Sequence, residues 1–203
     1  MTDNRDVARF DRWSSHYDCS IPQRFFFGPI QESTIAEAAR ESGEVNAALD
    51  VGCGTGQLLR RMATRYPDTE LLGVDPAPGM VRQAQAASDR RIEFRNAAAE
   101  KLPFADAHFD VVLTTLSFHH WADQRQGLHE VRRVLRDGGL FVLTDALGPG
   151  RLHWLVAHWR NEGRFHSPDG LDEMLAAERL HTVRRVSVPW RWQVKVTLAR
   201  AAD

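Results

Sequence analysis

Three glycines at alternate positions, directly behind an acidic residue, form the part of the chain best suited to chemistry. Gly52, Gly54 and Gly56 follow an apolar run that ends in Asp50. Glycine is needed where the backbone takes a positive φ or where a ligand must come close to the main chain. The helix expected to follow presents free N–H groups and the positive end of its dipole to such a ligand. The run therefore predicts the floor of a nucleotide-type pocket.

A second acidic residue, Asp75, ends the next apolar run along the chain. A carboxylate at the end of a second strand, about 20 residues after the first glycine, is placed to accept the hydroxyls of a ribose. The alternative is that Asp75 only caps the helix that follows it. Asp50 has a similar alternative, because an acid before a glycine turn can serve only to stabilise that turn.

Two adjacent histidines, His119 and His120, follow the apolar run at residues 109–114. Ligands of parallel sheets bind at the carboxyl ends of the strands, and histidine in general titrates near neutrality, which suits a general base. A structural role for the pair is the alternative. A metal site is not expected, because no third ligand is spaced with the two histidines.

Strand and helix signals alternate from residue 46 onward, which predicts βαβ units and a largely parallel sheet. The strands are expected at residues 47–51, 70–74, 92–95, 109–114 and 140–144, and the helices at 57–66, 76–87 and 123–135. Gly138 and Gly139 are expected to end the last of these helices and to release the strand after it. Two alternating segments, 182–188 and 191–198, predict an antiparallel hairpin.

Residues 1–44 precede the first expected strand and are predicted to be helical, with Phe10, Trp13 and Tyr17 on one helix face. That face either packs on the sheet or forms a lid over the pocket with Tyr17 at its tip. A single domain of 203 residues is expected, with the following parts: a helical lid (1–44), a cofactor-binding core (45–145) and substrate-side helices with the terminal hairpin (146–203).

The composition argues against several classes of protein. With 26 Lys and Arg, 27 Asp and Glu and a formal net charge of −1, the chain has no positive field to hold nucleic acid. Cys19 and Cys53 cannot build a disulfide framework, which favours a reducing compartment. No run approaches the ~18 apolar residues of a membrane span, and the start shows no signal-peptide pattern. A cytoplasmic monomer or homodimer, without nucleic-acid or membrane partners, is therefore expected.

Two cofactors suit a strand, a glycine turn and a helix. The dinucleotide fingerprint G-x-G-x-x-G requires a glycine where this chain has Gln57, and that mismatch counts against NAD. The run DVGCGTG at 50–56 instead resembles the glycine motif of the class I S-adenosylmethionine-dependent methyltransferases. Further segments resemble, in the right order, motifs of the ubiquinone/menaquinone C-methyltransferase-like (type 11) branch of that family: LLGVD at 71–75, AEKLPF at 99–104, FDVV at 109–112 and EVRRVLRDGG at 130–139.

The resemblance covers about residues 45–145 and implies a Rossmann-like, doubly wound α/β fold. This fold would have a mostly parallel seven-stranded sheet, with a C-terminal antiparallel hairpin and an N-terminal helical lid. The implied cofactor is S-adenosylmethionine, with Asp75 on its ribose and Asp50 at its ammonium group. Further cofactor contacts are implied for residues of the same turns and strand ends: Gly52, Cys53, Gly54, Gly56, Pro76, Met80, Ala99, Glu100, Thr115 and Leu116.

One position departs from the branch. Its members commonly carry the sequence GDAE, whose Asp accepts a hydrogen bond from the adenine amino group, whereas this chain has Ala98 at that place. A lost hydrogen bond costs about 1 kcal/mol net. Cofactor binding is therefore expected to persist, and to weaken unless Glu100 or a backbone group takes over the bond.

The expected function is methyl transfer from S-adenosylmethionine to a small-molecule acceptor. An apolar or aromatic acceptor is expected, because the residues predicted on its side of the pocket are aromatic and include Tyr17 and Trp154. His119 and His120 are the candidate catalytic residues. A non-catalytic protein that binds S-adenosylmethionine is the first alternative, and an NAD-linked oxidoreductase is the second.

Overall fold

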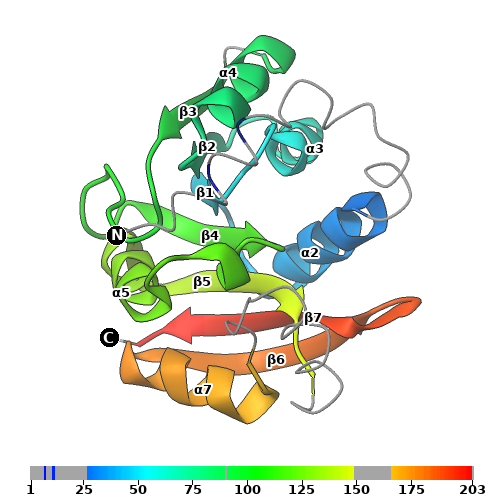
Figure 1. Ribbon diagram of the computed structural model, residues 1–203, viewed down its shortest axis with the longest axis vertical. Helices are drawn as coiled ribbons and strands as arrows, with labels where there is room; N and C mark the ends of the chain where they lie inside the picture. Colours follow the sequence, from blue (N-terminus) through cyan, green and yellow to red (C-terminus); the bar gives the residue numbers. More distant parts are fainter. Residues whose placement is uncertain (1–6, 8–10, 12–26, 90, 149–165, 203) are drawn as a thin grey trace.

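The computed structural model describes residues 7, 11, 27–89, 91–148 and 166–202. Helices and strands alternate along this part of the chain (Figure 1). The strands are β1 (Ala47–Val51), β2 (Glu70–Asp75), β3 (Ile92–Asn96), β4 (Phe109–Thr115), β5 (Leu135–Ala146), β6 (Leu180–Val188) and β7 (Arg191–Ala201). The helices are α2 (Gly28–Glu41), α3 (Gln57–Arg65), α4 (Pro78–Ala87), α5 (Gln124–Val134) and α7 (Pro168–Ala177), with a 3-10 turn, η2, at Phe118–His120.

The strands form one seven-stranded sheet in the order β3-β2-β1-β4-β5-β7-β6. The five strands from β3 to β5 pair in parallel, and β7 runs antiparallel to both β5 and β6. The predicted fold class is confirmed: the sheet is mostly parallel and ends in an antiparallel hairpin. Crossovers between parallel strands bring the carboxyl ends of β1, β2, β4 and β5 to one edge of the sheet, where ligands of such folds bind.

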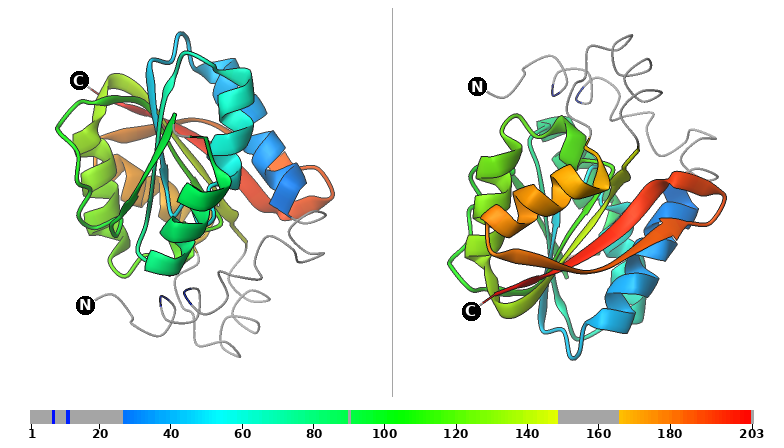
Figure 2. Two further views of the ribbon diagram at one scale, coloured as in Figure 1. Left: turned by 90° about the horizontal axis from the view of Figure 1, so that it is seen from above. Right: turned by 90° about the horizontal axis from the view of Figure 1, so that it is seen from below.

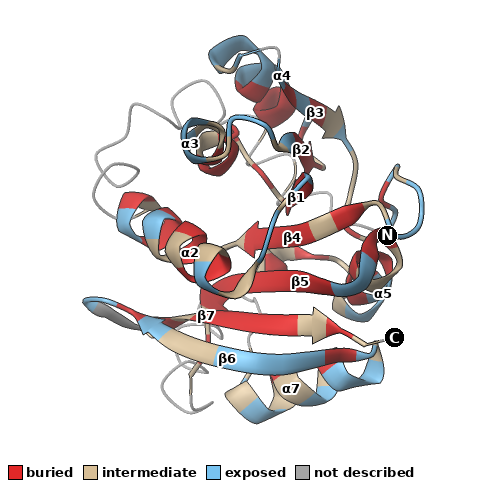
Figure 3. Cartoon of the chain, turned by 180° about the vertical axis from the view of Figure 1, so that it is seen from behind, coloured by how far each residue is buried: buried red, intermediate tan, exposed pale blue. Residues whose placement is uncertain are grey.

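Helices cover both faces of the sheet, which gives three layers (Figure 2). On one face α2, α3 and α4 bury side chains such as Ile30, Leu59 and Val81 in one apolar cluster. On the other face α5 and α7 bury Leu128 and Leu171 in a second cluster. The central strands are buried, and the edge strand β6 is largely exposed (Figure 3).

Helix α2 belongs to the core of the fold. Ile30 is fully buried, Ile35 is 2% exposed, and the Thr34 hydroxyl lies 2.8 Å from that of Thr144 on β5. Residues 28–41 were predicted to be part of a lid, but they form a core helix. The reason is that the apolar face of this helix packs against the sheet. Before Phe27 only Val7 and Asp11 are described, so the predicted lid residue Tyr17 lies outside the described residues.

Asp11 lies against the start of α4. Its Oδ1 accepts a hydrogen bond from the Gly79 N–H at 2.5 Å and lies 3.8 Å from Nη2 of Arg82. A carboxylate at this place satisfies one of the donors that the first turn of a helix leaves unpaired. Asp11 is thus hydrogen-bonded to the helix that follows β2.

The end of α5 differs from the prediction. The helix ends at Val134, and β5 begins at Leu135, before the two glycines that were expected to separate the elements. Leu135 pairs with Phe109 of β4, and the register shifts before the regular pairing of Val111 with Leu140. Gly138, at φ +71°, therefore lies in an irregular first part of the strand and does not end the helix.

Among the described residues, none of the helices is both long enough and apolar enough to cross a membrane.

Candidate active site

The glycine turn connects β1 to α3 and lies at the carboxyl edge of the sheet. The N–H groups of Gly52 and Cys53 both donate to the Val74 carbonyl of β2, at 2.8 and 3.0 Å. Gly54 has a φ of +53°, and no described atom lies within 4 Å of the place that a Cβ would take. One side of the turn is therefore an open backbone surface, as a ligand-binding floor requires.

Gly52→Ala should destabilise the protein strongly. Its φ is +77°, and an added Cβ would lie 1.8 Å from Oγ and 2.5 Å from Cβ of Ser117, so the segment after β4 would have to move. We expect a loss of about 2–3 kcal/mol, measured by thermal unfolding. The matched control is Gly54→Ala, which carries the same backbone strain into open space and should lower the melting temperature less. Equal losses for the two variants would contradict this account of Gly52.

Asp75 ties the glycine turn to the start of α4. Its Oδ2 accepts from the Gly54 N–H at 2.9 Å and its Oδ1 from the Ala77 N–H at 2.8 Å. Burial raises the pKa of Asp75 to about 6, although the two backbone bonds act in the opposite direction. The structural role considered for Asp75 is thus present in the fold. Each carboxylate oxygen has a second lone pair, so the same side chain can still accept ribose hydroxyls.

Asp50 is a buried carboxyl group close to a second acidic residue, Asp75. The residue is 2% exposed, and its Oδ1 has no hydrogen-bond partner in the described part of the chain. Burial, with the nearby charge of Asp75, raises the pKa of Asp50 to about 8. A buried charge without a partner costs several kcal/mol. The position therefore suits a cationic group of a ligand, which would pair with the carboxylate.

A second unsatisfied polar atom lies at the neighbouring strand end. The Thr115 hydroxyl, at the end of β4, is buried and has no partner among the described residues. Leu116, directly after it, has a φ of +52°, and its N–H donates to the Thr144 carbonyl of β5 at 2.8 Å. A cationic ligand group at Asp50 and a polar one at Thr115 would satisfy both orphaned groups. The two atoms thus fit a ligand that carries a cationic group near another polar group.

His119 and Asp145 form a hydrogen-bonded pair where β4 and β5 end. Nδ1 of His119 lies 2.9 Å from both carboxylate oxygens of Asp145, and the His119 N–H donates to Oδ2 at 3.1 Å. The side chains are 13% and 2% exposed, respectively. The carboxylate selects the tautomer that carries a proton on Nδ1, which leaves the lone pair on Nε2. The ring centroids of His119 and His120 lie 4.0 Å apart, with the two rings tilted by 47°.

Sequence reasoning did not include Asp145 among the site residues. Its signal was nevertheless the one that pointed to Asp50 and Asp75, an acid at the end of an apolar run. The missing information was that residue 145 and residue 119, on neighbouring strand ends, come within hydrogen-bonding distance.

Next to this pair, Phe118 is buried in the core and its ring contacts that of His166. Phe118 lies 5.9 Å from the ring of His166, whose Nε2 lies 2.9 Å from Oε1 of Gln124. Burial lowers the pKa of His166, although the charge of Asp145 acts in the opposite direction. Burial thus favours the neutral form of His166.

The other predicted site residues vary in their surroundings. Met80, Ala99 and Cys53 are buried, and burial raises the pKa of the Cys53 thiol, with smaller effects from Asp75 and Asp50. Oε1 of Glu100 accepts from the Asp123 N–H at 3.0 Å, which ties Glu100 to the start of α5. Trp154 lies outside the described residues. Within the described ranges, no three His, Cys, Asp or Glu side chains are grouped to hold a metal ion.

A glycine turn, two buried acids at adjacent strand ends and a sheet of this order define the class of Rossmann-like α/β proteins that bind a nucleoside cofactor. Comparison with known proteins agrees: residues 49–143 match the family described as a methyltransferase domain, Methyltransf_11. These residues form a methyltransferase domain of this family, which is the type 11 branch of the class I S-adenosylmethionine-dependent methyltransferases.

Similar proteins include methyltransferases of several kinds. A malonyl-[acyl-carrier protein] O-methyltransferase of Geobacter sulfurreducens is 36% identical over 165 residues, which are 79% of this chain and 60% of that protein. A demethylmenaquinone methyltransferase of Deinococcus radiodurans is 40% identical over 100 residues, which are 48% of this chain and 42% of that protein. The chain thus spans only part of the length of these relatives.

The fold matches a solved methyltransferase structure. This is the 1,6-didemethyltoxoflavin-N1-methyltransferase of Burkholderia thailandensis, with bound 1,6-didemethyltoxoflavin and S-adenosylhomocysteine. The TM-score is 0.73 at 20% identity, and the match covers 99% of this chain and 90% of that one. At this identity the likeness concerns the fold.

Proposed function

We propose that this chain transfers a methyl group from S-adenosylmethionine to a small-molecule acceptor that is apolar or aromatic. The observation that carries the proposal is the buried carboxyl of Asp50, which has an unpartnered oxygen beside an open glycine turn. A ligand with an ammonium group would neutralise this carboxylate, and its nucleoside would lie toward Asp75. The proposal assigns residues 45–145 to the cofactor and residues 146–203 to the acceptor side, in a cytoplasmic monomer or homodimer.

The chain's own residues would hold the cofactor in a fixed place. Asp50 would pair with its ammonium group, Asp75 would accept its ribose hydroxyls, and the backbone at Gly54 would allow close approach. When bound, S-adenosylmethionine supplies a methyl group on a sulfonium, which is open to in-line displacement. The protein's contribution would be alignment of the acceptor with that methyl group, and alignment is worth several kcal/mol.

The His119–Asp145 pair suits an acceptor that must lose a proton. Asp145 would orient the imidazole and stabilise its protonated form, and Nε2 would take the proton from an acceptor hydroxyl, amine or activated carbon. His166, whose neutral form is favoured by burial, supports an apolar or aromatic acceptor, because its ring adds flat surface.

Binding of S-adenosylhomocysteine should strengthen as the pH rises from 6 to 8. In the cofactor-free protein Asp50 keeps its proton below a pKa of about 8, and a protonated carboxyl cannot pair with an ammonium group. Binding should release close to one proton, so the Kd should fall by up to about tenfold per pH unit. Calorimetry in two buffers of different ionisation enthalpy counts the protons. A constant Kd with no proton release would contradict the assignment of Asp50.

A transfer assay tests the proposed function itself. Labelled S-adenosylmethionine is incubated with the protein and with phenolic, quinone and amine acceptors, and labelled product is expected with at least one of them. Tight binding of the cofactor with no transfer to any acceptor would favour the non-catalytic alternative. The NAD-linked alternative is disfavoured by Gln57 at the third glycine position and by the family match.

A further inference from the structure

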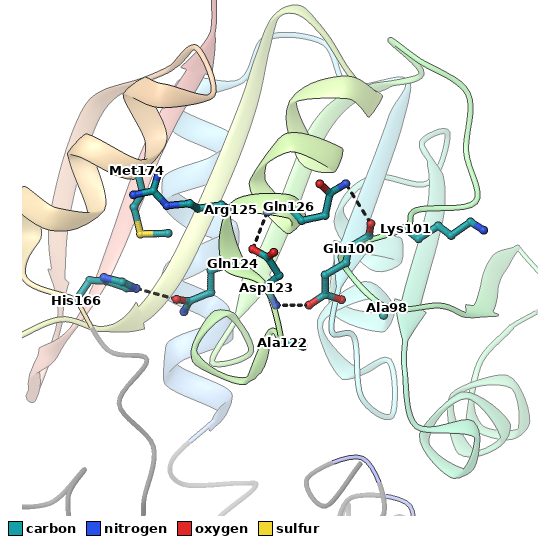
Figure 4. A pocket seen from close by; sticks show the side chains of 10 residues that line it. All are labelled: Ala98, Glu100, Lys101, Ala122, Asp123, Gln124, Arg125, Gln126, His166 and Met174. Carbon is teal, nitrogen blue, oxygen red and sulfur yellow. Dashed lines mark hydrogen bonds between the residues drawn. The ribbon is translucent and has the colours of Figure 1, made fainter. Parts of the chain in front are cut away.

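A groove of about 840 Å³ lies beside Ala98. It is bounded by the loop after β3, by the start of α5 and by α7, with Ala98 at one end and Met174 toward the other (Figure 4). Polar side chains such as Lys101 and Gln126 line it together with alanine and methionine. A groove of this size can hold an organic group larger than benzene, since a cavity of about 150 Å³ already holds benzene.

The order of the strands places this groove next to the base of the cofactor. This step rests on the proposed function, in which Asp50 holds the ammonium end and Asp75 the ribose. Since β2 lies between β1 and β3, a ligand that runs from Asp50 past Asp75 continues toward the end of β3. The loop at residues 97–101 follows that strand directly, so the base would lie against it.

At this loop the methyl group of Ala98 lines one end of the groove. Ala98 forms a turn, in which the Lys101 N–H donates to the Ala98 carbonyl at 3.2 Å. Glu100 does not occupy the space, because Oε1 accepts from the Asp123 N–H at 3.0 Å and its carbonyl accepts from Nε2 of Gln126 at 3.4 Å. Its carboxylate points toward α5 (Figure 4). An acidic side chain at position 98 would instead narrow the entrance to the groove.

We propose that the groove beside Ala98 is a subsite for a substituent on the exocyclic amine of the cofactor's adenine. Ala98 then determines cofactor specificity: it gives up a hydrogen bond to the amine and makes room beyond it. An aromatic substituent suits the subsite, because Ala98, Ala122 and Met174 offer apolar surface and the alkyl parts of Lys101 and Arg125 add to it.

Calorimetric titration with S-adenosylhomocysteine and with its N6-benzyl derivative tests this proposal. The wild-type protein should bind the two ligands with Kd values within about tenfold of each other. Ala98→Asp should bind S-adenosylhomocysteine about fivefold more tightly, through the regained hydrogen bond. The same variant should bind the N6-benzyl ligand at least about 30-fold more weakly than wild type, because the added carboxylate narrows the entrance.

Two further variants distinguish the effect of side-chain bulk at position 98 from the effect of a negative charge there. Ala98→Leu adds bulk without an acceptor, so it should weaken only the N6-benzyl ligand, by about tenfold or more. Ala87→Leu, at an exposed alanine of α4, is the matched control and should change neither Kd. The proposal is overturned if wild type binds the N6-benzyl ligand more than about 100-fold more weakly than S-adenosylhomocysteine, or if Ala98→Leu leaves the ratio unchanged. Failure of S-adenosylhomocysteine itself to bind would overturn the proposed function as well.

Discussion

Asp50→Asn should make the cofactor-free protein more stable at pH 8 and should weaken its binding of S-adenosylhomocysteine by about 10- to 100-fold. Burial and the charge of Asp75 raise the pKa of Asp50 to about 8 in the folded protein, against about 3.9 in an unfolded chain. Between these pH values the folded state holds a proton that the unfolded state has released. The free energy of unfolding therefore falls as the pH rises, by up to about 1.4 kcal/mol per unit.

Asparagine carries no titrating proton, so the free energy of unfolding of the variant does not fall with pH for this reason. Its advantage over wild type should grow between pH 5 and pH 8 by on the order of 3 kcal/mol. For a chain of this length that corresponds to roughly 6–12 °C in melting temperature. Thermal unfolding at the two pH values measures the stability, and calorimetry with S-adenosylhomocysteine measures the binding.

Asp110→Asn is the matched control, with the opposite sign. Burial by itself would raise the pKa of Asp110, but hydrogen bonds from the Ala47 and Asn46 N–H groups and from Arg136 outweigh it and lower the pKa. Asp110 lies where β4 begins, at the edge of the sheet opposite to the site. Its amide variant should lose about 1–3 kcal/mol and keep its affinity for S-adenosylhomocysteine. If Asp50→Asn instead behaved like Asp110→Asn, Asp50 would be a structural residue.

His119→Ala should lower the rate of methyl transfer by about 100-fold or more, because a positioned general base contributes factors of this size. The Kd for S-adenosylhomocysteine should stay within about threefold of wild type, since the imidazole acts on the acceptor side. Asp145→Asn should also lower the rate, because an amide no longer selects the tautomer with its proton on Nδ1. Single-turnover rates with labelled S-adenosylmethionine measure the effect on the chemical step.

Two other histidines provide controls for the His119 variant. His120→Ala removes the ring that lies against His119 and should cost less than His119→Ala. His129→Ala, at an exposed residue of α5 that pairs with Glu178, should leave the rate unchanged. Retained rates in both His119→Ala and His120→Ala would mean that positioning alone drives the transfer and that no base is used.

The strands were the most predictable part of the fold. Residues 47–51 were predicted and observed as a strand, and 109–114 became Phe109–Thr115, because continuous apolar runs of this length mark strands buried on both faces. The hairpin at the end of the chain was also predicted. The place of its two strands in the sheet was not predicted. Local alternation shows that two segments pair with each other, but it does not show that β7 lies between β5 and β6.

Long-range contacts explain what the sequence did not show. The sequence pattern of an amphipathic helix is the same whether its apolar face covers a sheet or a ligand. Nothing local therefore distinguished α2 from a lid. Helix α5 ends at Val134 because Leu135 pairs with β4, and this tertiary contact overrides the signal of the two glycines. Asp145 became a candidate residue only when the fold brought it to His119.

The central claim, that Asp50, Asp75 and the glycine turn bind S-adenosylmethionine, is tested most directly by calorimetric titration of the purified chain. S-adenosylmethionine, S-adenosylhomocysteine and NAD are titrated into wild type and into Asp75→Ala. We expect both sulfur nucleosides to bind wild type at one site, NAD not to bind, and Asp75→Ala to lose at least about tenfold in affinity. Binding of NAD alone, or an unchanged affinity of Asp75→Ala for S-adenosylhomocysteine, would contradict the account.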